Sequence, residues 1–278
     1  MKNLRDFGIN TPHRTYVIAE IGLNHGGDRA LAKKMIDAAV SAGVDAVKFQ
    51  TYLTEKRTFP GSPIFDILKK CELPFEAFKE LKEYSKAKNV DFFSTPFDDD
   101  SVDYLDSIGC DLYKVASFDV VNIPFLRKVA KTGKPVILSV GMSNLDEIRT
   151  AYDTLREHTK NIALLHCISA YPTKEEDANL NAVHTLQKEF ADCVIGQSDH
   201  TDDILVPLYA VAAGAQIIEK HFKLDGQDDC VDSPVSITTT QTKKMVEEIR
   251  RLEKILGTGN VQTSAPQKGA EIFRRPKA

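Results

Sequence analysis

Short apolar runs alternate with segments of helical periodicity along most of the chain. The runs are rich in Val, Ile, Leu and Phe, which is typical of strands buried on both faces of a parallel sheet. Eight runs predict strands, at 16–22, 46–51, 91–97, 112–117, 135–141, 162–171, 194–201 and 216–222. Between them, apolar residues recur every three or four positions and predict helices. An example is Leu31, Met35 and Ala39, a stripe that ends at Gly43 as a helix commonly does.

The number of strand–helix units favours one of two architectures. Alternating strands and helices form either an open doubly wound sheet or a closed barrel. No Gly-x-Gly-x-x-Gly turn follows the first strand, and a count of eight favours closure. We therefore predict an α/β fold, a single-domain (β/α)8 TIM barrel over residues 16–257. An N-terminal extension (1–15) precedes it, and a polar, extended tail (258–278) follows it.

Composition and charge exclude several classes of protein. The net charge of −4 argues against a general nucleic-acid binder, which is usually basic. No apolar run approaches the roughly 20 residues of a membrane span, and the N-terminus lacks the apolar core of a signal peptide. We therefore expect a cytoplasmic protein with no membrane segment. Five scattered cysteines without C-x-x-C spacing predict reduced thiols, not disulfides or a zinc site.

Two histidines at the ends of successive strands are the sharpest chemical feature. His200 ends the run 194–201, and His221 lies near the end of the run 216–222. The active site of such a barrel lies at the carboxyl ends of its strands, where two imidazoles can share one divalent cation. Two ligands leave coordination positions open, as in a catalytic site, and imidazole suits Mn²⁺, Co²⁺, Fe²⁺ or Zn²⁺. The alternative is one structural and one surface histidine.

Two lysines lie inside apolar strands. Burial of a lone ammonium group is costly, so Lys48 and Lys114 each need an anion. Other strand ends carry hydroxyl groups, on Thr95, Ser117, Ser139 and Ser198. Together these groups predict a pocket for a small phosphorylated carboxylate held by charge-assisted hydrogen bonds. In the alternative interpretation, each lysine forms a structural ion pair with a neighbouring Asp or Glu.

Eight strings around these positions match a known family in the same order. They are AEIGLNHGGD, VKFQT, STPFD, YKVASFD, LSVGMS, LLHCISAYPT, GQSDHT and IEKHF. They resemble the sialic acid synthase family, and the resemblance spans residues 15–257. These enzymes condense phosphoenolpyruvate with an N-acetylated hexosamine, such as N-acetylmannosamine or a 2,4-diacetamido-trideoxyhexose. The resemblance therefore implies an enzyme that makes a nine-carbon nonulosonic acid and releases phosphate.

The resemblance also implies a role for individual residues. It assigns a divalent metal, usually Mn²⁺ with Co²⁺ or Mg²⁺ as alternatives, to His200 and His221. It assigns phosphoenolpyruvate to Lys48, Thr95, Lys114, Ser117, Ser139 and Ser198. It implies catalytic roles for Glu20, Lys48, Gln50, Lys114 and Asp119, and sugar contacts from Asp119, Ser169, Tyr171 and Asp232. In the implied reaction the metal activates the sugar aldehyde, the enol carbon attacks it, water adds, and phosphate leaves with C–O cleavage.

The chain departs from the sialic acid branch on the sugar side. Residues 116–119 read Ala-Ser-Phe-Asp where Gly-Ser-Gly-Glu is common, and Ser169 stands where asparagine is common. Residues 232–236 read Asp-Ser-Pro-Val-Ser in place of a Gly-Pro-Asp-His form. These differences resemble the pseudaminic and legionaminic branches, whose sugars carry two acetamido groups.

A second departure concerns the end of the chain. Family members usually carry a C-terminal antifreeze-like (SAF) domain that supplies an arginine to the sugar of the partner subunit. The sequence stops about where that domain would begin, so we expect this domain and its arginine to be absent. The site is then completed differently or by a separate protein, or the chain is truncated. We expect a homodimer formed through barrel helices.

Two alternative functions remain. One is a related phosphoenolpyruvate-condensing synthase of a seven- or eight-carbon keto acid. Such an enzyme needs extra arginines for a second phosphate, and no strand-end arginine occurs here. The other is a catalytically silent barrel that binds phosphoenolpyruvate and metal. The two buried lysines argue against the silent barrel, because a scaffold does not need them.

Overall fold

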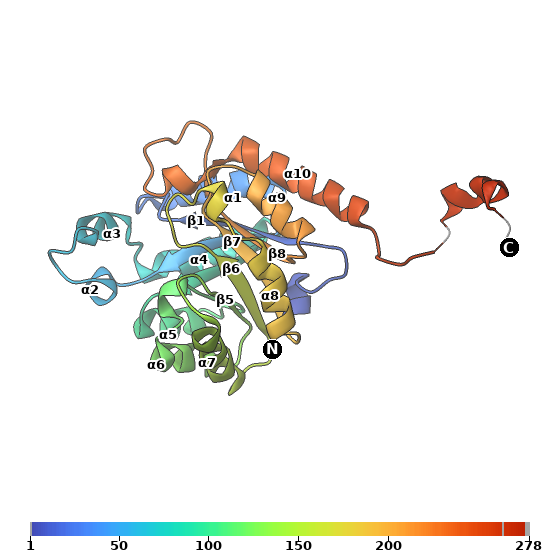
Figure 1. Cartoon of the computed structure of the whole chain (residues 1–278). Coiled ribbons are helices and arrows are strands. Elements are labelled where there is room, and N and C mark those ends of the chain that lie inside the picture. The colour runs from blue at the N-terminus through green and yellow to red at the C-terminus, as the bar shows by residue number, and fades with distance from the viewer. Residues whose placement is uncertain (1, 263, 276–278) are drawn as a thin grey trace.

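The chain forms a closed barrel of eight parallel strands (Figure 1). The structure, a computed structural model, describes residues 2–262 and 264–275. The strands are β1 (Tyr16–Gly22), β2 (Ala46–Thr51), β3 (Asp91–Pro96), β4 (Tyr113–Val115), β5 (Val136–Ser139), β6 (Ile162–Cys167), β7 (Val194–Asp199) and β8 (Ile217–Lys223). They pair in sequence order, and β1 also pairs with β8, which closes the barrel. The predicted TIM barrel is confirmed.

Helices cover the outside of the barrel. The longer ones are α1 (Arg29–Ala42), α4 (Phe75–Ala87), α5 (Asp99–Ser107), α6 (Ile123–Ala130), α7 (Leu145–Arg156), α8 (Asn181–Glu189), α9 (Leu205–Ala212) and α10 (Thr239–Leu256). The limits of α1 follow from its caps. The Asp28 side chain accepts hydrogen bonds from the amides of Ala30 and Leu31, and Gly43 adopts a left-handed φ of 83°.

The pairing register places polar side chains of different strands at the same level. Glu20 of β1 is level with Lys48 of β2 on one side and with His221 of β8 on the other. Asp199 of β7 is level with Lys220 of β8. Because parallel strands all point the same way, these levels lie at the carboxyl end of the barrel.

Several strands end earlier than predicted. The run 112–117 contains only the three residues of β4, because the chain turns at Ser117–Asp119 into a short 3-10 helix, η2. The run 162–171 likewise ends as β6 at Cys167. Their final polar residues therefore lie beyond the strands that were predicted to hold them, in η2 or in the segment after β6.

The segment between β2 and β3 contains two short helices before α4. They are α2 (Thr54–Arg57) and α3 (Phe65–Cys71), and they flank a loop that reads Phe-Pro-Gly-Ser-Pro at 59–63. The loop itself is exposed, with 70% of the Phe59 surface accessible. Leu68 and Cys71 of α3 pack against Leu23 in a small apolar cluster separate from the main core.

The two terminal segments differ in how they meet the barrel. At the N-terminus, the short 3-10 helix η1 (Leu4–Phe7) contributes Leu4 and Phe7 to the main core. At the C-terminus, the prediction of an extended tail is wrong over Ala265–Phe273, which forms the 3-10 helix η5. The Ser264 amide donates to Gln267 Oε1 and caps this helix. Figure 1 shows η5, in red, lying apart from the barrel.

A two-residue strand, β9 (Ile237–Thr238), extends the sheet by pairing with β8. Within the described residues, no helix combines the length and apolar character needed to cross a membrane.

Candidate active site

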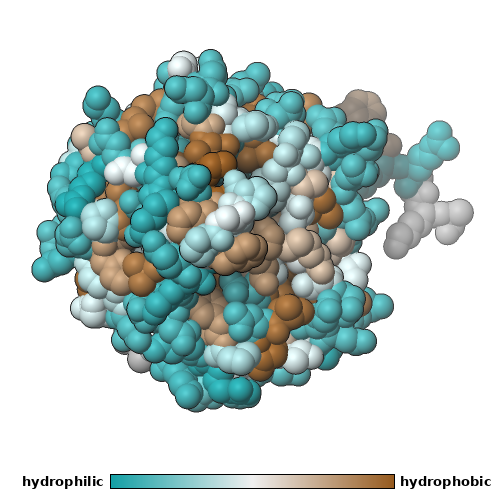
Figure 2. Space-filling view, turned by 90° about the vertical axis from the view of Figure 1, so that its left-hand side faces the viewer, coloured by the Kyte–Doolittle hydropathy of each residue, from teal (hydrophilic) through white to brown (hydrophobic). Residues whose placement is uncertain are grey.

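A cavity of about 210 Å³ opens at the carboxyl end of the barrel. Its lining includes every predicted site residue except Asp119 and Ser169, namely Glu20, Lys48, Gln50, Thr95, Lys114, Ser117, Ser139, Tyr171, Ser198, His200, His221 and Asp232. Figure 2 views the molecule from the side on which α2 and α3 lie. It shows hydrophobic surface near the centre of a largely hydrophilic face.

Asp119 and Ser169 lie beside this cavity and are absent from its lining. Asp119 lies in η2, where its Oδ1 accepts a hydrogen bond from Asn122 Nδ2 at 3.1 Å, and burial raises the pKa of its carboxyl group. Ser169 follows β6, and its hydroxyl lies 3.9 Å from the sulfur of Cys167. Both residues lie just beyond the ends of strands, Asp119 in η2 after β4 and Ser169 in the segment after β6.

The two lysines at the base of the cavity have carboxylate partners within the chain. Lys48 Nζ lies 2.8 Å from Glu20 Oε2 and 3.7 Å from Glu219 Oε2. Lys114 Nζ lies 3.9 Å from Glu219 Oε1. The ion-pair interpretation therefore describes contacts that do occur. These ion pairs leave both lysines able to bind a further anion, because the single negative charge of Glu219 is shared between two ammonium groups.

Glu219 is a central residue of the cavity that is absent from the predicted site. Its Oε1 accepts a hydrogen bond from Ser198 Oγ at 2.8 Å. Burial acts to raise the pKa of Glu219, but the charges of Lys114 and Lys48 outweigh it and lower that pKa to about 2. A signal for this residue was present, because a carboxylate interrupts the apolar strand Ile217-Ile218-Glu219 just as lysines interrupt β2 and β4.

The two lysines differ in how well their charge is compensated. Burial acts to lower the pKa of Lys48, but Glu20 and Glu219 outweigh it and raise that pKa. Burial lowers the pKa of Lys114, and Glu219 does not fully offset it, partly because the Lys48 charge acts in the same direction as burial. Ser139 Oγ is buried and has no hydrogen-bond partner among the described residues. A bound anion would thus stabilise the charged form of Lys114 and accept a hydrogen bond from the Ser139 hydroxyl.

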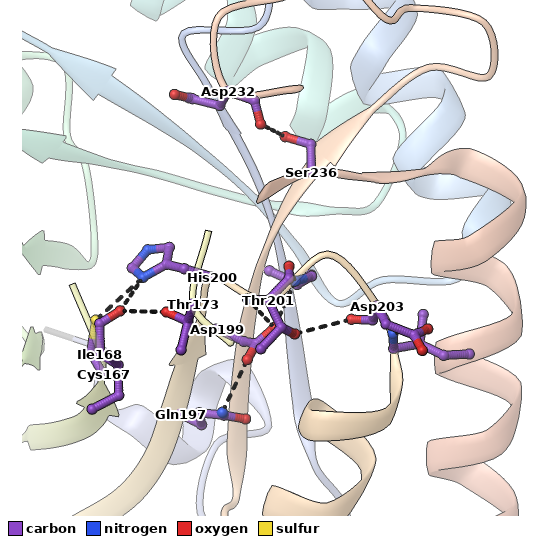
Figure 3. Close-up of polar contacts among 12 residues, drawn as sticks. Cys167, Ile168, Thr173, Gln197, Asp199, His200, Thr201, Asp203, Asp232 and Ser236 are labelled. Atoms are coloured by element: carbon purple, nitrogen blue, oxygen red, sulfur yellow. Dashed lines mark hydrogen bonds and ion pairs between the residues drawn. The ribbon is translucent and has the colours of Figure 1, made fainter. Parts of the chain in front are cut away.

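The His200 ring is held in one orientation by the backbone. Its Nδ1 lies 2.8 Å from the Ile168 carbonyl oxygen, as Figure 3 shows. A carbonyl only accepts, so Nδ1 carries the proton and Nε2 keeps its lone pair. Burial, together with the nearby His221, lowers the pKa of His200 to about 3. The ring is therefore neutral at physiological pH, as a metal ligand must be.

The His221 ring lies beside that of His200, with ring centroids 5.4 Å apart. Its Nδ1 is buried without a hydrogen-bond partner and lies 3.5 Å from Asp232 Oδ2. Such an orphaned nitrogen fits a site that a cation or water completes. In residues 2–262 and 264–275, no group of three or more His, Cys, Asp or Glu side chains is arranged to hold a metal. The two histidines would thus leave several coordination positions to water or substrate.

The comparisons with known proteins agree with this geometry. The chain matches the model of the NeuB family over residues 35–261. The chain belongs to the NeuB family. The resemblance to sialic acid synthases noted from the sequence is thereby confirmed.

Relatives of this NeuB family member include enzymes of two branches. It is 39% identical to the N,N'-diacetyllegionaminic acid synthase of Campylobacter jejuni subsp. jejuni serotype O:2, over 94% of this chain and 84% of that protein. It is 32% identical to the pseudaminic acid synthase of Campylobacter jejuni subsp. jejuni serotype O:23/36, over 96% of this chain and 82% of that protein.

A solved structure supports the same grouping. The N-acetylneuraminic acid synthetase of Leptospira borgpetersenii serovar Hardjo-bovis, in complex with citrate, superposes with a TM-score of 0.91 at 41% identity. The match covers 94% of this chain and 91% of that chain.

Two further residues of this NeuB family member, both with ionisable side chains, line the cavity without having been predicted to do so. Cys167 at the end of β6 lies with its sulfur 3.7 Å from His200 Nδ1, and burial raises the pKa of its thiol. All five cysteines are free in the structure. The other residue is Arg57 of α2, which lies outside every predicted strand and so carried no signal in the apolar pattern.

Proposed function

We propose that this protein condenses phosphoenolpyruvate with an N-acetylated hexosamine to form a nine-carbon nonulosonic acid and free phosphate. The observation that carries the proposal is the placement of two buried lysines and two histidines around one cavity. The names of the relatives in two nonulosonic acid branches support it.

Phosphoenolpyruvate would occupy the base of the cavity. Lys48 and Lys114 would donate charge-assisted hydrogen bonds to its phosphate and carboxylate groups. The hydroxyl groups that can add further hydrogen bonds are those of Thr95, Ser117, Ser139 and Ser198. The ligand would compete with Glu219 for both lysines, so its binding must compensate for weakening these internal pairs.

We assign a divalent metal, Mn²⁺ with Co²⁺ or Mg²⁺ as alternatives, to His200 and His221. The bound metal would supply Lewis-acid polarisation of the sugar aldehyde. The chain's own contribution is orientation. The Ile168 carbonyl fixes the His200 ring, and the Asp232 carboxylate lies next to His221.

The amino sugar would bind towards the mouth, over the phosphoenolpyruvate. Gln50, Tyr171 and Asp232 line that part of the cavity, and we assign sugar contacts to Tyr171 and Asp232. We also propose Asp119 and Ser169, which lie beside the lining, as sugar contacts. We propose a 2,4-diacetamido-trideoxyhexose over N-acetylmannosamine because the sugar-side residues at 116–119, 169 and 232–236 resemble the pseudaminic and legionaminic branches. Overall identity does not separate the two sugars, since it is 39% with a diacetyllegionaminic acid synthase and 41% with an N-acetylneuraminic acid synthetase.

The overall reaction forms one carbon–carbon bond and breaks one carbon–oxygen bond. C3 of phosphoenolpyruvate bonds to the aldehyde carbon, and the aldehyde oxygen takes up a proton. Water adds to the former enol carbon, and phosphate departs with the bridging oxygen. Glu20 lies between Lys48 and Gln50, with Oε1 accepting from Gln50 Nε2 at 3.1 Å, so we assign proton transfer to it.

The proposal is tested by phosphate release from phosphoenolpyruvate in the presence of Mn²⁺. The sugars to compare are N-acetylmannosamine and the two 2,4-diacetamido-trideoxyhexoses of mannose and altrose type, with a reaction lacking sugar as the control. We expect release that depends on one diacetamido sugar. Absence of sugar-dependent release in all reactions would contradict the proposal.

A further inference from the structure

Arg57 brings a guanidinium group to the cavity from outside the barrel strands. It is the last residue of α2, and its half-buried side chain forms part of the cavity lining. The guanidinium carbon lies 3.7 Å from the ring centroid of Phe97 and 4.7 Å from that of Tyr52. Contact with two aromatic rings restricts the guanidinium group while leaving its N–H edge free to donate.

Among the described residues, Gln50 is the only one that accepts a hydrogen bond from the Arg57 side chain. Its Nη1 donates to Gln50 Oε1 at 2.9 Å, whereas a guanidinium group has five N–H donors. Within the part of the chain that the structure describes, no carboxylate forms an ion pair with Arg57. Lys48 and Lys114 differ in this respect, because both lie near Glu219. A partly desolvated cation with spare donors on a cavity wall is suited to a ligand.

The electrostatic surroundings restrict the kind of ligand. Burial lowers the pKa of Arg57, and the carboxylates of Asp232, Glu20 and Asp119 oppose that effect from beyond ion-pair distance. Burial outweighs these carboxylates, but they place negative charge around the guanidinium group at longer range. A second phosphate dianion would approach these carboxylates, whereas a neutral ligand with oxygen acceptors would not meet this repulsion.

The position of Arg57 relative to the lysines indicates which substrate it meets. β2 runs towards the mouth of the barrel and presents Lys48 and then Gln50 to the cavity. Gln50 donates a hydrogen bond to Glu20 and accepts one from Arg57. Glu20 lies near the base of the cavity beside Lys48, so Arg57 lies on the mouth side of Gln50. A substrate that binds above phosphoenolpyruvate would therefore contact Arg57.

We propose that Arg57 is a specificity-determining residue that donates hydrogen bonds to an acetamido carbonyl oxygen of the amino sugar. The inference rests on the proposed synthase function and extends it. It makes the preferred second substrate a neutral acetamido sugar, not its phosphate ester.

The test compares Arg57→Met and Arg57→Lys with wild type. Lys56→Met is the matched control, because Lys56 lies on the same helix but pairs with Asp100 at the surface. KM is measured separately for the diacetamido sugar and for phosphoenolpyruvate, and sugar binding is measured by calorimetry with phosphoenolpyruvate present. We expect Arg57→Met to raise the KM for the sugar about 10- to 100-fold, the range for a lost charged hydrogen bond. The KM for phosphoenolpyruvate should stay within about twofold of wild type.

Arg57→Lys should restore little of the lost affinity, because an ammonium group lacks the planar fork. The Lys56→Met variant should match wild type in both KM values. Equal rises in both KM values, or an unchanged KM for the sugar, would overturn the inference and indicate that Arg57 only packs α2 against the barrel. A preference for the phosphorylated sugar would also overturn it.

Failure of the proposed function is distinguishable from failure of this inference. A wild type that binds the sugar in calorimetry without turnover contradicts the synthase function, and the Arg57→Met binding constant still tests the inference. A wild type that binds no acetamido sugar at all overturns the inference directly.

Discussion

Lys220 Nζ lies 2.6 Å from Asp199 Oδ2, and each residue immediately precedes one of the two histidines of the cavity. Both side chains are almost fully buried, with exposures of 1% and 2%. Neither lines the cavity. Lys220 also donates to the Thr201 carbonyl, and Asp199 accepts from the Thr201 hydroxyl. This buried pair joins the ends of β7 and β8 behind His200 and His221, and Figure 3 shows part of its hydrogen bonding.

Removing one member of this pair should destabilise the barrel. Lys220→Met leaves the Asp199 carboxylate buried without its cation, which costs about 3–5 kcal/mol of unfolding free energy. Urea denaturation measures the change. The double variant Lys220→Met/Asp199→Leu should lose less, because no isolated charge remains. A double variant as unstable as the single one would show that the charge of Asp199 is not the cause.

Removal of the metal should abolish turnover. With two protein ligands proposed, His200→Ala or His221→Ala should each lower kcat/KM by at least about 100-fold. Excess chelator should do the same to wild type, and Mn²⁺ should restore activity. His184→Ala is the control, because His184 is exposed on α8. Full activity of the wild type in chelator would contradict the metal assignment.

Lys114 should control the affinity for phosphoenolpyruvate. Lys114→Met removes a buried donor from the base of the cavity and should raise the KM for phosphoenolpyruvate by about 10- to 100-fold. The KM for the sugar should change far less. Lys131→Met, at an exposed position, is the matched control. Initial-rate measurements with each substrate varied in turn distinguish the two effects, and a larger change in the KM for the sugar would refute the assignment.

Close packing inside the barrel gives a prediction about stability that does not depend on the proposed reaction. A Cβ atom added at Gly196 of β7 would lie 2.5 Å from the Ile217 carbonyl oxygen and 2.7 Å from Leu165 Cδ2. Gly196→Ala should therefore destabilise the protein by about 1–3 kcal/mol. Gly269→Ala serves as control, because an added Cβ there would meet no atom within 4 Å from the described residues beyond its own neighbours in the chain. Thermal unfolding compares the two, and an unchanged Gly196→Ala variant would refute the packing argument.

The barrel could be predicted because its strands obey a simple rule. Strands covered on both faces must be apolar, so polar residues such as Lys48 and His200 stood out at once. Parallel pairing then brings all strand ends to one side, which gathered most of the predicted residues around one cavity. Glu219 is likewise a charged residue within an apolar strand, so the same argument could have predicted it as a site residue.

Other features depend on information that periodicity does not contain. The partners of Lys48 come from β1 and β8, and only closure of the barrel brings Glu20 and Glu219 to its level. Arg57 reaches the cavity from a four-residue helix with no apolar repeat. Asp119 ends the short 3-10 helix η2, where the local turn decides the direction of the side chain.

The most direct test of the central claim is the stoichiometry of the reaction. Wild-type protein is incubated with phosphoenolpyruvate, the diacetamido sugar and Mn²⁺, and mass spectrometry and a phosphate assay follow both products. The account predicts one nine-carbon keto acid for each phosphate released, and neither product from the His200→Ala or His221→Ala variants. Phosphate without the nine-carbon acid, or equal product from the histidine variants, would contradict it.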